Sequence, residues 1–115
     1  MKRSFVLVAG ALAIAAPAAA HHGWGSYDAA RPVTVTGAIL TSKYENPHAI
    51  LTVKGSDQTW KVTLAPTSRM TSRGALASIL AVGKTISAYG YPSTVDQDEM
   101  RAERITVDGK TYEMR

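Results

Sequence analysis

Alternation of apolar and polar residues is the dominant pattern of the chain from residue 32 onward. In residues 32–44, Val33, Val35 and Ile39 share one parity, and threonines lie largely on the other. Branched side chains in alternation predict a long β-strand with one buried face. Gly37 interrupts the run on the apolar parity, which predicts a bulge or a sharp bend of the kind that curls a strand into a barrel.

Later segments repeat this two-residue period, and turn-forming residues separate them. Residues 55–58 and the pair Asp108-Gly109 are typical of tight turns between paired strands. The apolar parity slips between Ala102 and Ile105, which predicts a bulge there. We therefore expect further strands at residues 49–54, 59–64, 86–91, 100–107 and 110–114.

One segment has the helical period instead. Leu76, Ile79 and Leu80 are spaced as on one face of a short amphipathic helix over residues 74–80, and residues 66–70 are typical of a turn or a short helical piece. Three strands, a small helix, two strands and a terminal hairpin arm predict an all-β, OB-fold-like five-stranded barrel. The alternative is a small antiparallel sandwich or an open meander.

The first twenty residues follow neither period. Lys2 and Arg3 precede an apolar run of roughly 12 residues, and Ala18 and Ala20 occupy the small-residue positions of a cleavage site. The run is shorter than the ~20 residues that span a bilayer. This pattern predicts a secretory signal peptide that is cleaved after Ala20.

Cleavage there would define the organisation and the compartment. We expect a leader at residues 1–20, an extended N-terminal segment at 21–31 and the OB-like barrel domain at 32–115. The mature protein would be periplasmic or secreted, with no membrane anchor after cleavage.

Composition narrows the classes of function. Loss of Lys2 and Arg3 with the leader would lower the formal net charge from +4 to +2. Such a chain lacks the concentrated basic stripe that follows phosphates, so we expect no nucleic-acid partner. The absence of cysteine excludes thiol redox chemistry, thiolate zinc sites and cysteine catalysis. No Gly-x-Ser-x-Gly elbow is present, so the sequence favours a binding protein over an enzyme.

Histidine is the residue type best suited to carry chemistry here. His21 and His22 would begin the mature chain, and His48 follows Asn46-Pro47. The α-amine and imidazole of His21 can chelate one ion, and His48 could supply the third nitrogen of a T-shaped copper site, the histidine-brace arrangement. Cleavage one or two residues earlier would instead make His22 or His21 the third residue, a position that chelates Cu(II) or Ni(II) with the free amine. We predict a metal site at His21, His22 and His48, with copper ahead of zinc and a carrier or buffer role.

The alternative is a metal-free OB-like module that binds a small ligand or an envelope protein partner, its histidines merely solvated. Trp60 shares parity with core residues, whereas Tyr89 and Tyr91 would face outward and could form a binding face. Arg69 and Arg73, four residues apart, could bind an anion together or form a solvated helix face.

Three motifs suggest a family. They are His-His-Gly-Trp at residues 21–24, Asn-Pro-His at 46–48 and Leu-Ala-Pro-Thr-Ser-Arg-Met at 64–70. They resemble those of small exported bacterial proteins known only as a domain of unknown function. The resemblance covers essentially all of the mature chain, and it implies export and a compact β-rich domain. It implies no activity, so the copper prediction depends on the residues alone.

Overall fold

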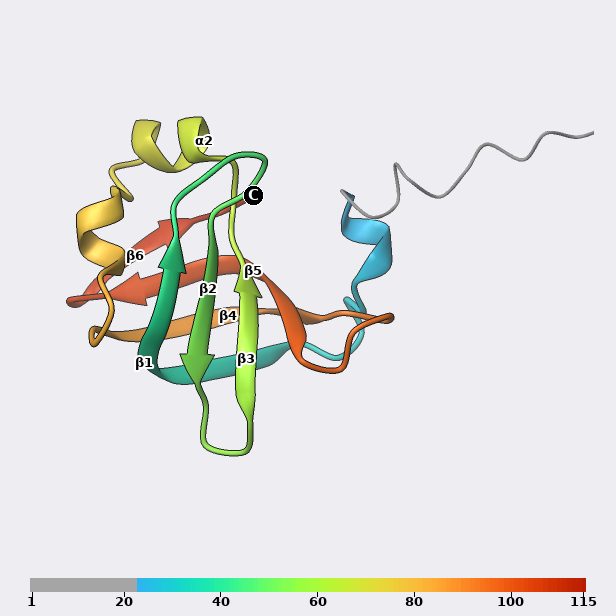
Figure 1. Ribbon diagram of the computed structural model, residues 1–115. Coiled ribbons are helices and arrows are strands. Elements are labelled where there is room, and N and C mark those ends of the chain that lie inside the picture. Colours follow the sequence, from blue (N-terminus) through green and yellow to red (C-terminus); the bar gives the residue numbers. More distant parts are fainter. Residues whose placement is uncertain (1–22) are drawn as a thin grey trace, which may run out of the picture.

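A computed structural model, which describes residues 23–115, places five strands in a closed barrel with a sixth strand bonded outside it and one short α-helix (Figure 1). The prediction of a mostly-β, OB-like barrel is confirmed. The strands are β1 (Val33–Lys43), β2 (Ile50–Lys54), β3 (Thr59–Thr63), β4 (Thr85–Pro92), β5 (Glu99–Val107) and β6 (Lys110–Glu113). Among the described residues, no helix is long and apolar enough to cross a membrane.

The barrel closes through a parallel pairing of β3 with β5, while the other strand pairs are antiparallel in the order β3-β2-β1-β4-β5-β6. In this closing seam Lys61 pairs with Glu99 and Thr63 with Arg101. Val62 and Met100, between them, are buried in the core. Because side chains alternate along a strand, the polar residues of the seam lie on the outside of the barrel.

β1 serves two sides of the barrel. Residues 33–38 pair with β4, and residues 38–43 pair with β2. Gly37 lies at the changeover, where a Cβ would clash with the backbone oxygen of Lys54. The register shifts between Ile39 and Thr41, so the predicted irregularity is present, with the extra residue three positions after the glycine. Glycine is needed here for close approach of two backbones.

The predictions for the C-terminal hairpin are also confirmed. Tyr89 pairs with Arg104 and Gly90 with Ala102, which leaves Glu103 as the extra residue of a bulge in β5. The turn before β6 contains Asp108 and Gly109 with φ angles of 51° and 76°. Left-handed angles at both positions are those of a two-residue hairpin turn.

The predicted helix at residues 74–80 is wrong. The α-helix α2 spans Thr67–Ser72, and a 3-10 turn, η2, covers Ala77–Leu80. Gly74, with a φ of 83°, ends α2, and the Ala75 N–H donates to the Met70 carbonyl at 2.8 Å. This pattern is a Schellman cap, which stops a helix. Met70, Ala75 and Leu80 are fully buried, so this segment packs onto the core as two short turns.

The N-terminal segment, expected to be extended, contains a 3-10 turn, η1 (Trp24–Ser26), followed by an isolated bridge between Tyr27 and Ser93. The Asp28 N–H donates to the Pro92 carbonyl at 2.9 Å, and the Thr94 N–H donates to the Ser26 carbonyl at 2.8 Å. These bonds fix residues 24–28, here called the N-terminal hook, beside the β4–β5 loop (Figure 1). The leader and His21 and His22 lie outside the described residues.

Candidate functional site

The side chain of Trp24 joins the N-terminal hook to the barrel. The Cζ atom of Arg101 lies 4.2 Å from the centroid of the Trp24 ring, and that of Arg115 lies 4.4 Å from it. The ring also makes edge contacts with Tyr27 and Tyr91 at centroid distances of 6.5 and 6.0 Å. Guanidinium groups are attracted to the face of an indole ring, so two charges hold this side chain in place.

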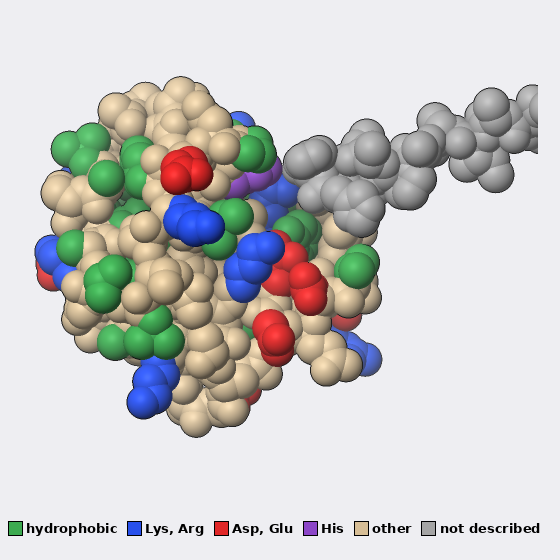
Figure 2. Space-filling model, in the orientation of Figure 1, with side chains coloured by type: hydrophobic (Ala, Val, Ile, Leu, Met, Phe, Trp, Pro, Cys, Tyr) green, Lys and Arg blue, Asp and Glu red, His purple; other side chains and the backbone are tan. Residues whose placement is uncertain are grey.

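His48 meets the same arginine. Its Nε2 atom lies 3.5 Å from Nη2 of Arg101. Backbone bonds of Ala49 with Leu64 and Ala65 fix the chain directly after it. Figure 2 shows a histidine side chain, in purple, recessed next to basic side chains. Arg101 therefore contacts both the N-terminal hook and the predicted ligand His48.

Glu99 binds the side chain of Tyr27, a second aromatic residue of the hook. Its Oε2 atom accepts hydrogen bonds from the hydroxyls of Tyr27 at 2.7 Å and Thr63 at 2.6 Å. Burial and the neighbouring Glu99 raise the pKa of Tyr27 to about 12. Tyr27 thus remains a hydrogen-bond donor at neutral pH, and it anchors the hook to the closing seam.

Arg101 is unusual among the charged residues because it is only 5% exposed. Burial has the largest effect on its pKa and lowers it, and the positive charges of Arg69 and Arg115 lower it further. Arginine stays charged in proteins despite such shifts. Arg101 and Arg115 therefore share the Trp24 ring, and the charge of Arg69 is near enough to act on Arg101.

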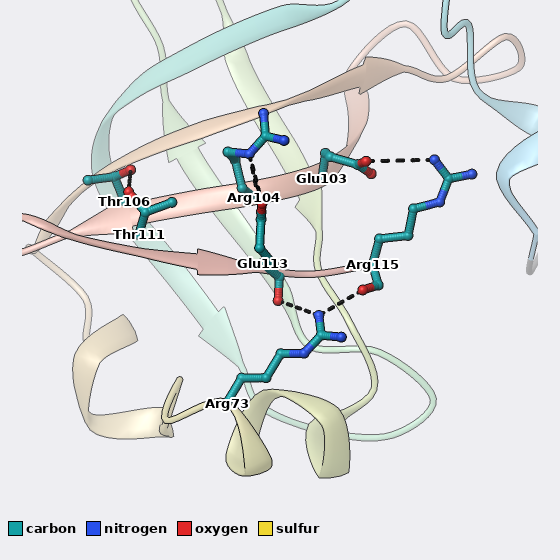
Figure 3. A network of polar contacts seen from close by, with 7 residues as sticks. All are labelled: Arg73, Glu103, Arg104, Thr106, Thr111, Glu113 and Arg115. Atoms are coloured by element: carbon teal, nitrogen blue, oxygen red, sulfur yellow. Dashed lines mark hydrogen bonds and ion pairs between the residues drawn. The ribbon is translucent and has the colours of Figure 1, made fainter.

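The other two arginines also have contacts in the C-terminal part of the chain. Nη1 of Arg69 donates to the Met114 carbonyl at 3.2 Å, and Nη1 of Arg115 lies 3.7 Å from Oε1 of Glu103. Arg73 donates to the carbonyls of Glu113 and Arg115 at 2.8 and 2.7 Å (Figure 3). Arg69 and Arg73, predicted to bind an anion together or to be solvated, thus both tie α2 to the chain around β6.

The predicted aromatic positions are placed as expected. Trp60 is in the core at 9% exposure. Tyr89 and Tyr91 lie on the outer side of β4, half-buried, with ring centroids 6.2 Å apart. Arg104 lies over Tyr89 with its Cζ atom 5.0 Å from the ring centroid. With Trp24, the two tyrosines form a continuous aromatic row along the barrel surface.

Sequence reasoning gave no site role to the residues that build this site, namely Tyr27, Glu99, Arg101 and Arg115. In β5, charged residues flank the buried Met100, which is also the pattern of an ordinary solvated strand face. The sequence therefore offers no signal that separates Arg101 from a solvated arginine. Among residues 23–115, no three histidine or carboxylate side chains are grouped so as to hold a metal ion.

A separate hollow lies across β1, β2 and β3. Its volume is about 490 Å³, and it is lined by Thr41, Lys43, Ile50, Thr52 and Lys61. OB-folds bind oligonucleotides and oligosaccharides on the face formed by strands 2 and 3. The hydroxyls of Thr41 and Thr52 are already bonded to each other at 2.6 Å. This hollow lacks the buried charge and aromatic rings that characterise the region around Trp24.

Comparison with known families decides the classification. Residues 9–102 match the model of a family of unknown function, DUF6152. The chain belongs to this family. The match confirms the resemblance indicated by the three sequence motifs and supplies no activity. A comparison with curated proteins finds no relative.

Solved structures support the barrel fold alone. A ZRD-deleted mutant of TiaS in complex with agmatine matches with a TM-score of 0.54 and 18% identity, over 73% of this chain and 26% of that one. A complex of TiaS with tRNA and ATP matches with a TM-score of 0.52 and 18% identity, over 70% and 19%. Apo TiaS, a tRNA agmatidine synthetase, has a TM-score of 0.51 at 19% identity, over 67% and 18%. The chain thus spans about a quarter of the TiaS protein or less, and the likeness concerns one barrel.

Proposed function

We propose that this protein is exported to the periplasm or the medium and carries or buffers copper, with His21, His22 and His48 as ligands. The observation that supports this proposal is the contact chain from Trp24 through Arg101 to His48. Three residues span at most about 10 Å in extended form. A terminus created by cleavage after Ala20 would therefore begin within reach of His48.

The proposed ligand set suits copper. The α-amine and imidazole of His21 would chelate the ion, and the imidazole of His48 would complete a T-shaped set of three nitrogens. His22 would serve as a further or alternative nitrogen ligand. Because residues 24–28 are already bonded to the barrel, the hook itself would lose little conformational freedom when the ion binds.

The test uses the precursor with its own leader, expressed in an exporting bacterial host. Mass spectrometry identifies the mature N-terminus, and Cu(II) is titrated while EPR spectra are recorded. We expect a nitrogen-rich site with one ion per chain and submicromolar affinity. His48→Ala should weaken binding by about tenfold or more and remove one nitrogen from the spectrum.

Ser56→Ala is the matched control, because it removes an exposed polar side chain from the β2–β3 turn, at the other end of β2 from His48. Its affinity should equal that of the unmodified protein. Micromolar binding that His48→Ala leaves unchanged would reduce the site to a generic terminal chelator and refute the proposal.

The second candidate is a metal-free module that binds a small ligand or an envelope partner. The aromatic row of Trp24, Tyr89 and Tyr91, with Arg104 over Tyr89, favours this role. Its test is an NMR titration of the metal-free protein with candidate ligands. Saturable shifts centred on Tyr89 and Tyr91, with no copper affinity dependent on His48, would support it over the copper carrier.

A further inference from the structure

We infer that Arg69, Arg101 and Arg115 form a binding site for an oxyanion, a carboxylate or phosphate group of a small ligand. The inference goes beyond metal binding, because the site consists of guanidinium groups and does not need the metal. The inference is based on the positions of these three arginines, which come from three separate parts of the fold.

Each arginine comes from a different part of the fold. Arg69 is on α2, Arg101 is on β5 and Arg115 follows β6. Arg101 and Arg115 both lie over the ring of Trp24, at 4.2 and 4.4 Å. Arg69 donates to the carbonyl of Met114, the residue next to Arg115. The cluster is thus held by an aromatic ring and by backbone, which fixes the guanidinium groups in position.

The cluster has donors to offer a ligand. A guanidinium carries five N–H groups in a planar fork that matches the oxygens of a carboxylate or phosphate. Within residues 23–115, Arg69 and Arg115 each contact an oxygen atom through one side-chain nitrogen. The side chain of Arg115 is 55% exposed, so solvent reaches this edge of the cluster. A guanidinium stacked on a ring keeps its N–H groups directed outward in its own plane.

The charges of the cluster favour an added anion. Three like charges repel one another, and Arg101 is buried, which makes the repulsion stronger. Two carboxylate side chains from the described part of the chain are near. Glu99 already accepts hydrogen bonds from Tyr27 and Thr63, and Glu103 lies 3.7 Å from Arg115. An oxyanion would relieve the repulsion, and it would compete with Glu103 for Arg115.

The position of the cluster also links it to the proposed copper site. Arg101 lies 3.5 Å from His48, so its charge opposes a metal ion held there. A bound oxyanion would offset that charge. Copper and the anion should therefore each increase the affinity of the protein for the other, since coupling between two sites is reciprocal.

The test is an NMR titration of the exported, metal-free protein with inorganic phosphate and, separately, with malonate, at constant ionic strength. We expect saturable shifts of the Trp24 indole and of the arginine side-chain resonances of the cluster. Arg115→Gln should weaken binding by about tenfold. Arg115→Lys, which keeps the charge without the fork, should have an affinity between those of the unmodified protein and Arg115→Gln.

Arg31→Gln is the matched control, because Arg31 is an exposed arginine that pairs with Asp28 outside the cluster. It should leave the affinity unchanged within about twofold. Tighter binding of phosphate than of malonate would identify a phosphate group as the preferred ligand. Tighter binding of malonate would identify a carboxylate as the preferred ligand. Shifts that never saturate, or equal losses in Arg31→Gln and Arg115→Gln, would overturn the inference whether or not copper binds.

Discussion

Trp24 is the residue on which the site depends most, because it connects two parts of the chain that are far apart in sequence. Its ring contacts Arg101 from β5 and Arg115 after β6, and Arg101 in turn contacts His48. The tryptophan of the His-His-Gly-Trp motif could be noticed in the sequence. Its partners could not be predicted, because a contact between residues 24 and 101 produces no local pattern in the sequence.

Trp24→Ala should remove the shorter of the two aromatic contacts between the N-terminal hook and Arg101, leaving that of Tyr27 at 5.8 Å. Cation–π contacts contribute about 0.5–2 kcal/mol each, so we expect copper affinity to fall by about tenfold. The EPR spectrum should lose the nitrogen of His48 while terminal chelation persists. Trp24→Phe, which keeps an aromatic face, should recover most of the affinity. An unchanged spectrum in Trp24→Ala would show that the hook does not position the terminus.

Tyr27 gives the hook a dependence on pH. Its pKa is raised from 10.0 to about 12, because burial and Glu99 disfavour the phenolate. A group that binds its proton more tightly in the folded state contributes stability that is fully present below pH 10 and lost as pH rises towards 12.

We therefore expect the free energy of unfolding to fall between pH 10 and 12 more steeply in the unmodified protein than in Tyr27→Phe. Urea denaturation at several pH values measures this difference. Tyr89→Phe is the control and should follow the unmodified protein. Parallel curves for Tyr27→Phe and the unmodified protein would contradict the account.

At the scale of elements, most strands could be predicted because each has one buried face and a two-residue period. The bulge at Glu103 and the turn at Asp108 and Gly109 followed from parity and turn chemistry. The helix at residues 74–80 was wrong because Leu76 and Ile79 have helical spacing, whereas the left-handed Gly74 ends the helix before them. Leucine spacing alone does not distinguish a helix from two short turns on one core.

Gly37→Ala tests the closeness of β1 to β2. A Cβ at this position would clash with the backbone of Lys54, so the strands would have to move apart. We expect a loss of about 2 kcal/mol or more in the free energy of unfolding, measured by urea denaturation. Gly25→Ala, where a Cβ meets no atom within 4 Å, is the control. Equal stability of the two variants would argue against the close approach.

At the scale of the whole molecule, the barrel brings one end of the β1–β2 loop, the closing seam and the N-terminal hook together. The barrel class could be predicted from the order of elements, and the position of the hook could not, because it depends on long-range bonds to the β4–β5 loop. This arrangement brings Trp24 of the first sequence motif and His48 of the second to the same arginine, Arg101. The proposed function follows from that shared contact.

The most direct test of the central claim is paramagnetic broadening by Cu(II) in the exported protein. An ion bound at the mature N-terminus should broaden the NMR signals of His48, Ala49 and Arg101 at substoichiometric copper, because the proposal makes His48 a ligand of the same ion. Signals of Ser56, in the β2–β3 turn, should remain sharp. Broadening confined to the first residues of the mature chain, with sharp signals from His48, would contradict the account.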